Sequence, residues 1–154
     1  MAEERSDIVI EGNQATWEIR TEGLIQGTYS GTFRFRCFLN PMQQVAAGRD
    51  YREMMGPNMG LAPEHESFLA WSLCQLKYRI ISAPPFWGNE SGIIGGGNLP
   101  DEEIVPMVLD AAMAAENKYK DSLRKRKEEA IKRAKMAGEA ILKDRKAAPE
   151  EDEE

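Results

Sequence analysis

The spacing of apolar residues changes from a strand pattern to a helix pattern within one stretch, YSGTFRFRCFLNPMQ, residues 29–43. Up to residue 39 the residues alternate, and one side of an extended strand would carry Tyr29, Gly31, Phe33, Phe35, Cys37 and Leu39. Arg34 and Arg36 fall on the other side, and this period of two indicates a β-strand. Residues 16–20 alternate in the same way, and glycines at 23 and 27 supply a turn between the two runs. The pattern predicts an antiparallel hairpin, with a short third strand at residues 8–10.

The periodicity becomes helical at Asn40. Asn40 can cap a helix, Pro41 suits its first position, and Gln43 completes a capping box. We expect this helix to end near Gly56. A second helix is predicted from Pro63 up to the Pro84-Pro85 pair, with an apolar stripe of Leu69, Leu73, Leu76 and Ile80.

A third and much longer helix is predicted over residues 101–146, because only Gly138 interrupts its good helix formers. Asp101-Glu102-Glu103 would place negative charge at its start. The helix has an apolar stripe up to Leu123, no apolar side chain at residues 124–129, and a narrower stripe beyond. We therefore expect its second half to project from the body.

These elements predict an α+β fold, with the hairpin packed on two helices and followed by a long charged helix. We expect a body of residues 1–123 that includes a glycine-rich loop at 86–99, mobile at Gly95–Gly97. A projecting helix at 124–146 and a disordered acidic tail at 147–154 follow. The predicted core residues are Phe33, Phe35, Leu69, Leu73, Leu76, Ile80, Val108 and Tyr119.

Charge is distributed unevenly along the chain. Residues 1–115 have a net charge of −7, residues 116–146 of +6, and residues 147–154 of −5. Neither an apolar run long enough to span a bilayer nor a secretory signal is present, and we expect an intracellular protein.

Side-chain clusters typical of catalysis are missing from the sequence. The glycines at 92–97 fit neither a P-loop nor a dinucleotide fingerprint, which leaves a plain loop as the favoured interpretation. Glu64-His65-Glu66 is better explained as the first turn of a helix than as a metal site, because adjacent helical residues point in different directions. Cys37 and Cys74 are expected to be reduced core thiols. We therefore expect no catalytic, cofactor-binding or metal-binding residues, no cofactor and no enzymatic activity.

Two segments are candidates for binding a partner. Phe86 and Trp87 follow two prolines, and they would either fold back to close the core or form an aromatic knob for a partner. The long helix offers a second set, namely Arg124, Arg126, Ile131, Ala134 and Ile141. Its basic residues also fit a nucleic-acid binder, but Glu128 and Glu129 interrupt the basic face, so a solvated or protein-binding helix is favoured.

Several stretches resemble a known class of protein. They are residues 35–41 (FRCFLNP), 47–56 (AGRDYREMMG), 75–79 (QLKYR) and 83–87 (APPFW). The arrangement, over roughly residues 28–120, resembles small proteins from the morphogenesis modules of tailed bacteriophages, particularly tail assembly chaperone-like and minor virion proteins.

The resemblance implies a non-enzymatic protein that needs no cofactor. It would bind other phage structural or assembly proteins, or copies of itself, in the host cytoplasm or, as a structural component, in the virion. The long charged helix is a departure, since it exceeds what a compact chaperone needs. A component wedged between virion subunits would accommodate it equally well.

Overall fold

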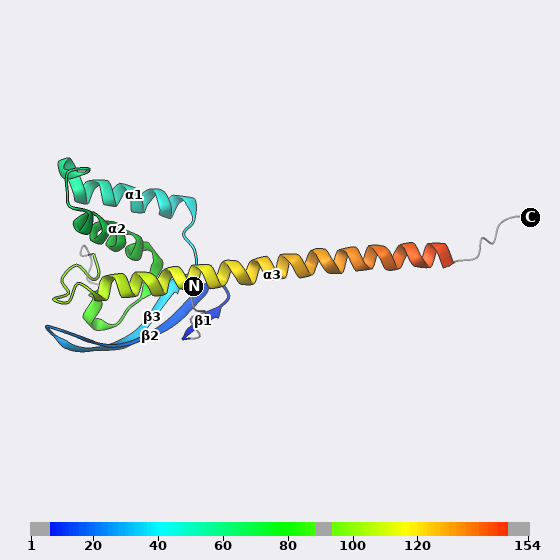
Figure 1. The fold of residues 1–154 in the computed structure, drawn as a ribbon, viewed down its shortest axis with the longest axis horizontal. Coiled ribbons are helices and arrows are strands. Elements are labelled where there is room, and N and C mark those ends of the chain that lie inside the picture. Colours follow the sequence, from blue (N-terminus) through cyan, green and yellow to red (C-terminus); the bar gives the residue numbers. More distant parts are fainter. Residues whose placement is uncertain (1–6, 89–93, 148–154) are drawn as a thin grey trace, which may run out of the picture. The chain divides into compact units, whose positions relative to one another are not determined.

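A computed structural model of the chain describes residues 7–88 and 94–147 and has the predicted α+β fold (Figure 1). The chain divides into two compact units, Met1–Tyr119 and Lys120–Glu154. The acidic tail expected at 147–154 falls almost entirely outside the described residues. The elements are β1 (Ile8–Glu11), β2 (Gln14–Gly23), β3 (Gly27–Arg36), α1 (Pro41–Met55), the 3-10 turn η1 (Gly56–Asn58), α2 (Glu64–Arg79), β4 (Ile80–Ser82), the 3-10 turn η2 (Pro85–Trp87) and α3 (Ile104–Ala147).

The four strands form one antiparallel sheet in the order β1-β2-β3-β4. Its register places Trp17 opposite Phe33 and Ala15 opposite Phe35. The alternating apolar residues therefore share one buried face, while Glu18 and Arg34 lie exposed on the other. This confirms the predicted hairpin and the short first strand.

The core lies between the inner face of the sheet, the first half of α3 and α2 (Figure 1). Phe33 is at its centre, with ring centroids 5.5–6.0 Å from the rings of Trp17, Phe35, Phe86 and Trp87. Of the predicted core residues, Phe33, Phe35, Leu76 and Val108 are fully buried. Leu69, Leu73, Ile80 and Tyr119 are only partly buried and pack against the edge of the core.

Helix α1 begins where the sequence predicts. Asn40 Oδ1 accepts a 2.9 Å hydrogen bond from the Gln43 backbone N–H, and Gln43 Oε1 accepts one of 3.0 Å from the Asn40 backbone N–H. These two bonds form the capping box. Helix α1 is held to α2 through Asp50, whose carboxylate accepts hydrogen bonds from Lys77 Nζ (2.8 Å) and the Tyr78 hydroxyl (2.6 Å).

The second helix ends earlier than predicted. It stops at Arg79, and residues 80–82 form β4, which pairs with the edge of β3. Ile80 and Ile81 are β-branched and therefore suit a strand, and Pro84 restricts the residue before it to an extended conformation. The apolar residue Ile80 is thus part of the sheet and not of the predicted helical stripe.

The start of α3 also differs from the prediction. The helix begins at Ile104, with no acidic residue in its first turn. Asp101 is buried, with an exposed fraction of 1%, and does not decorate the start of the helix. Its carboxylate instead accepts hydrogen bonds from the β2–β3 turn.

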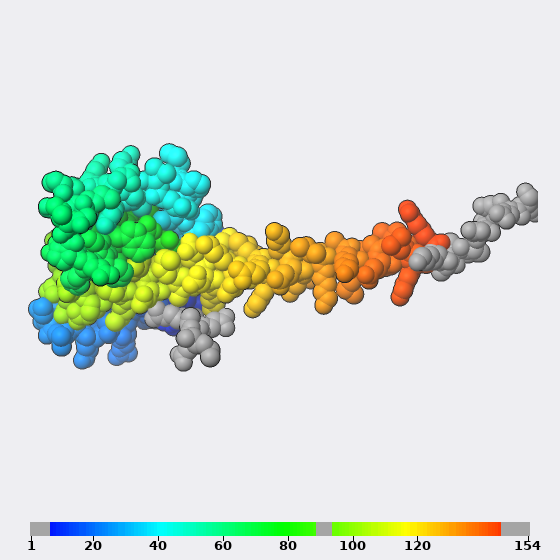
Figure 2. Space-filling view, turned by 45° about the horizontal axis from the view of Figure 1, so that its top comes forward, coloured from blue at the N-terminus to red at the C-terminus, as the bar shows by residue number. Residues whose placement is uncertain are grey.

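The second unit consists of the later part of α3 in the described residues, and we call residues 120–147 the arm. Nearly every side chain described in it is exposed, and the side chains stand apart from one another along the yellow-to-orange helix (Figure 2). Among residues 7–88 and 94–147, no helix combines the length and apolar character that a bilayer crossing requires.

Candidate protein-binding site

The turn between β2 and β3 carries two of the most exposed apolar side chains of the body. Leu24 has an exposed fraction of 95% and Ile25 of 73%. Exposed large aliphatic residues at the tip of a hairpin contribute nothing to the core and therefore suggest contact with a partner. In the sequence, the flanking glycines alone predicted this turn. The two adjacent aliphatic residues between them, at positions where polar residues are usual, are the signal that could have indicated a binding site.

A buried carboxylate holds this turn in place. Asp101 Oδ1 accepts a 2.8 Å hydrogen bond from the Ile25 N–H, and Oδ2 accepts bonds from the Gln26 N–H and the Tyr29 hydroxyl, each of 2.9 Å. A Cβ atom at Gly23 would overlap the same carboxylate, so glycine is required there. The turn is therefore rigidly attached to the residues that precede α3, and its two apolar side chains are presented in a fixed geometry.

The hydrogen bonds at Asp101 also affect its ionisation. Burial alone would raise the pKa of this carboxyl group. The backbone N–H groups of Gln26 and Ile25 and the Tyr29 hydroxyl stabilise the carboxylate more strongly, and the pKa lies below its ordinary value of 3.8. The Tyr29 pKa is raised, first by burial and then by its bond to Asp101.

We predict that Asp101 stabilises the fold in a pH-dependent way. Because its pKa is lower in the folded state, its contribution is complete above pH 3.8 and is lost as the pH falls through the folded-state value. Asp101→Asn should lower the unfolding midpoint at neutral pH, since an amide NH2 would face a backbone N–H. The difference from the wild type should shrink in acid. Chemical denaturation from about pH 2 to pH 7 measures this.

Glu102→Gln is the matched control for that experiment, because the Glu102 side chain is 64% exposed and its 3.2 Å pair with the equally exposed His65 is a surface pair, which contributes little to stability. It should leave the unfolding midpoint near the wild-type value at every pH. A gap between wild type and Asp101→Asn that stays constant down to the lowest pH would contradict the role assigned to Asp101.

The arm carries the second exposed apolar surface. At 100° per residue, Leu123, Ile131, Ala134, Gly138, Ile141 and Leu142 fall within a stripe about 100° wide, which Lys127 and Arg145 interrupt. Ile131 and Ile141 are 59% and 56% exposed, and the small residues at 134 and 138 leave room for close approach by another chain. The same spacing puts Arg124 and Arg126 on opposite borders of the stripe. All the candidate residues predicted on this helix are exposed.

Of the two alternatives for Phe86 and Trp87, the structure shows the one in which they fold back onto the core, and not the exposed aromatic knob. Trp87 is 4% exposed, and Phe86 packs against the rings of Tyr29 and Phe33. The glycine loop contributes to this packing, because Cβ atoms at Gly95 and Gly96 would overlap the Trp87 indole. This pair therefore closes the core, because the inner face of the sheet needs a large apolar cover near Phe33. Residues 95–97 form a turn against Trp87, while residues 89–93 of the same loop lie outside the described residues.

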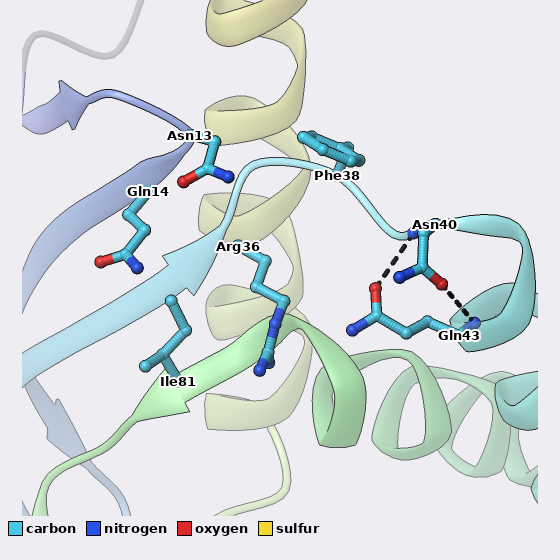
Figure 3. Close-up of a pocket in the computed structure, with 7 residues that line it drawn as sticks. All are labelled: Asn13, Gln14, Arg36, Phe38, Asn40, Gln43 and Ile81. Atoms are coloured by element: carbon cyan, nitrogen blue, oxygen red, sulfur yellow. Dashed lines mark hydrogen bonds between the residues drawn. The ribbon is translucent and has the colours of Figure 1, made fainter.

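A pocket of about 250 Å³ lies between the sheet and the start of α1 (Figure 3). The Arg36 guanidinium extends into this region and donates a 2.9 Å hydrogen bond from Nη1 to the Tyr78 carbonyl. Asn40 and Gln43 use part of their hydrogen-bonding capacity in the capping box. The lining offers amide and guanidinium donors but no carboxylate, imidazole or thiol that could act as a general base. It consists of Asn13, Gln14, Arg36, Phe38, Asn40, Gln43 and Ile81.

The two cysteines are buried and free, as predicted. Burial, followed by the nearby Glu116 charge, raises the pKa of Cys37 to about 11, and burial also raises that of Cys74. Both thiols are therefore protonated and unreactive near neutral pH. In the part of the chain that the structure describes, no group of three or more His, Cys, Asp or Glu side chains is arranged to hold a metal ion.

Comparisons with known protein families, with curated proteins and with solved structures find no match to this chain.

Proposed function

We propose that the chain is a non-enzymatic, protein-binding component of tailed-phage assembly, similar to tail assembly chaperones. Exposure of the arm is the observation that carries the proposal. A lone helix gains most of its stability from packing against other elements. The arm has large apolar side chains, among them Ile131 and Ile141, that are more than half exposed. Such a stripe suits one partner helix or groove.

The charge of the arm supports a protein partner over nucleic acid. Residues 120–147 carry 11 Lys and Arg and five Asp and Glu, and the acidic residues lie among the basic ones. Glu128 and Glu129 would face a phosphate backbone together with the neighbouring basic groups. An acidic protein surface is a better match, because the basic groups border an apolar stripe.

A structural minor protein of the virion, in the tail, neck or baseplate, is the second candidate. The length of α3, 44 residues, favours it, because a long helix can lie between subunits of a particle. Mass spectrometry of purified particles separates the two candidates. A chaperone is absent from the finished particle, whereas a virion component is present in a fixed copy number.

Truncation after Leu123 tests the protein-binding role of the arm. We expect the shortened chain to lose the helical circular dichroism signal of residues 124–147 but to keep the unfolding midpoint of the full chain, because the core residues all precede this point. Copurification with coexpressed morphogenesis proteins of the same phage should fall at least about tenfold, equivalent to 1.4 kcal/mol or more.

The double substitution Ile131→Ser and Ile141→Ser, which keeps the length of the chain, should reproduce this loss. Val9→Ser is the matched control, since Val9 is a similarly exposed apolar residue, 54%, on the body. Unfolding of the truncated chain, or full binding without the arm, would contradict the proposal.

A further inference from the structure

We propose that the β2–β3 turn of one copy docks onto the arm of a second copy, so that the chain associates head to tail. The inference rests on the proposed protein-binding role of the arm and identifies its partner surface. Leu24 and Ile25 form the apolar centre of the docking surface, and exposed acidic side chains surround it. Each copy would then offer one turn and one arm.

The turn is suited to docking because its geometry is fixed before binding. The three hydrogen bonds to Asp101 restrain the backbone on both sides of Ile25. A surface that is already ordered loses less conformational entropy when it binds. Leu24 and Ile25 can therefore contact the apolar stripe of an arm without the cost of ordering a loop.

The border of this surface is acidic. Glu22 precedes the turn, and Glu102 and Glu103 follow Asp101, all three with exposed side chains. The start of α2 lies at the same end of the body (Figure 1), where His65 Nε2 is 3.2 Å from Glu102 Oε1. Glu64 and Glu66 flank this histidine. Lys and Arg are absent from residues 22–27, 61–67 and 99–104.

The arm has the complementary pattern. At helical spacing its apolar stripe is bordered by Arg124 and Lys135 on one side and by Arg126 and Arg133 on the other, with Asp144 as the one acidic residue at that border, and the basic residues Lys127 and Arg145 lie within it. Apolar centres would therefore meet each other, and acidic borders would meet basic ones. Complementary charge accelerates association and selects the partner. The same contrast holds for whole segments, since residues 1–119 carry a net −7 and residues 120–147 a net +6.

A second copy is favoured over other occupants because this chain itself supplies the complementary surface. An anionic membrane would be repelled by the acidic border. Where two copies do not exchange this contact reciprocally it is heterologous, and repetition gives a ring or an open filament. Such growth would be expected of a component that is repeated along a particle.

Sedimentation of the purified full-length chain at low salt tests this arrangement. The wild type should form oligomers that dissociate as salt is added, because screening weakens the contact between charged borders. The turn variant, Leu24→Ser with Ile25→Ser, and the arm variant, Ile131→Ser with Ile141→Ser, should each be monomeric at concentrations at least about tenfold above those at which the wild type associates. All four positions are exposed, so both variants should fold.

Mixing the two variants is the decisive measurement. The turn variant keeps an intact arm and the arm variant keeps an intact turn, so an equimolar mixture should form dimers that cannot grow further. Met42→Ser, at a 77% exposed position elsewhere on the body, should associate like the wild type.

A wild type that stays monomeric, or a mixture that does, overturns the head-to-tail contact. So does a turn variant that associates like the wild type. If the arm variant still fails to copurify with other morphogenesis proteins in that case, the proposed function stands and only the partner surface is wrong.

Discussion

Replacing Phe33 with alanine should destabilise the body by about 3–5 kcal/mol, the range for truncating a fully buried aromatic side chain. The Phe33 side chain has no exposed surface. Its ring lies 5.7 Å from Trp17 and 5.5 Å from Trp87, measured between centroids. These contacts come from β2 and η2, two elements that are far apart in the sequence. The substitution would therefore remove contacts between elements as well as leave a cavity.

Equilibrium unfolding in urea, followed by circular dichroism, measures the change in the free energy of unfolding. Phe68→Ala is the matched control, because the Phe68 side chain on α2 is 44% exposed. We expect it to cost about 1 kcal/mol or less. A cost at Phe33 no greater than that at Phe68 would show that the aromatic cluster is not the centre of the core.

Local signals in the sequence were sufficient for most of the architecture. The alternation around Phe33 and Phe35 predicted the hairpin, because a strand with one buried face must repeat every two residues. The capping pattern of Asn40 and Gln43 predicted the start of α1, because both partners lie within one helical turn. In each case the residues that determine the structure are close together in the chain.

The features that the sequence did not reveal depend on distant contacts. Strand β4 is only three residues long, and it is a strand because β3 offers an unpaired edge. Asp101 looked like an ordinary acidic residue before a helix, but its hydrogen-bond partners lie 72–76 residues away. The aliphatic pair Leu24 and Ile25 within a turn was a signal in the sequence, but only the structure shows that neither side chain folds back into the core.

Whether Trp87 is buried or exposed also could not be decided from the local sequence. Its sequence context, two prolines followed by two aromatic residues, fits an exposed knob as well as a core residue. The choice depends on whether the sheet and α3 leave space that needs an apolar cover, and local sequence contains no information about that space. The structure fills it with the indole, against Phe33 and the turn at Gly95 and Gly96.

Removing the charge of Glu116 should cost about 3–5 kcal/mol, because it would leave a buried cation without its anionic neighbour. Arg79 and Glu116 join the end of α2 to α3, with Arg79 Nη1 3.6 Å from Glu116 Oε1. Their side chains are only 8% and 13% exposed. The Arg79 Nη1 atom has no hydrogen-bond partner among the described residues, so the pair depends on charge attraction more than on directed bonds.

The loss of stability caused by removing the Glu116 charge should largely disappear when the Arg79 charge is removed as well. Replacing a buried ion pair by apolar side chains of similar size is often neutral or stabilising, because the cost of desolvating two charges disappears. We therefore expect Glu116→Leu alone to be strongly destabilising, and Arg79→Met with Glu116→Leu to recover most of the loss. Urea unfolding of the wild type, both single variants and the double variant gives the interaction energy of the pair.

Asp121 provides the matched control, because its pairing with Arg124 is of the same type but exposed, with side chains 64% and 71% accessible. Asp121→Leu should change the free energy of unfolding by no more than about 1 kcal/mol, as expected for a surface pair. Equal costs at Glu116 and Asp121 would contradict the argument from burial. So would a double variant at positions 79 and 116 that is less stable than Glu116→Leu alone, because the remaining guanidinium would then not be the source of the cost.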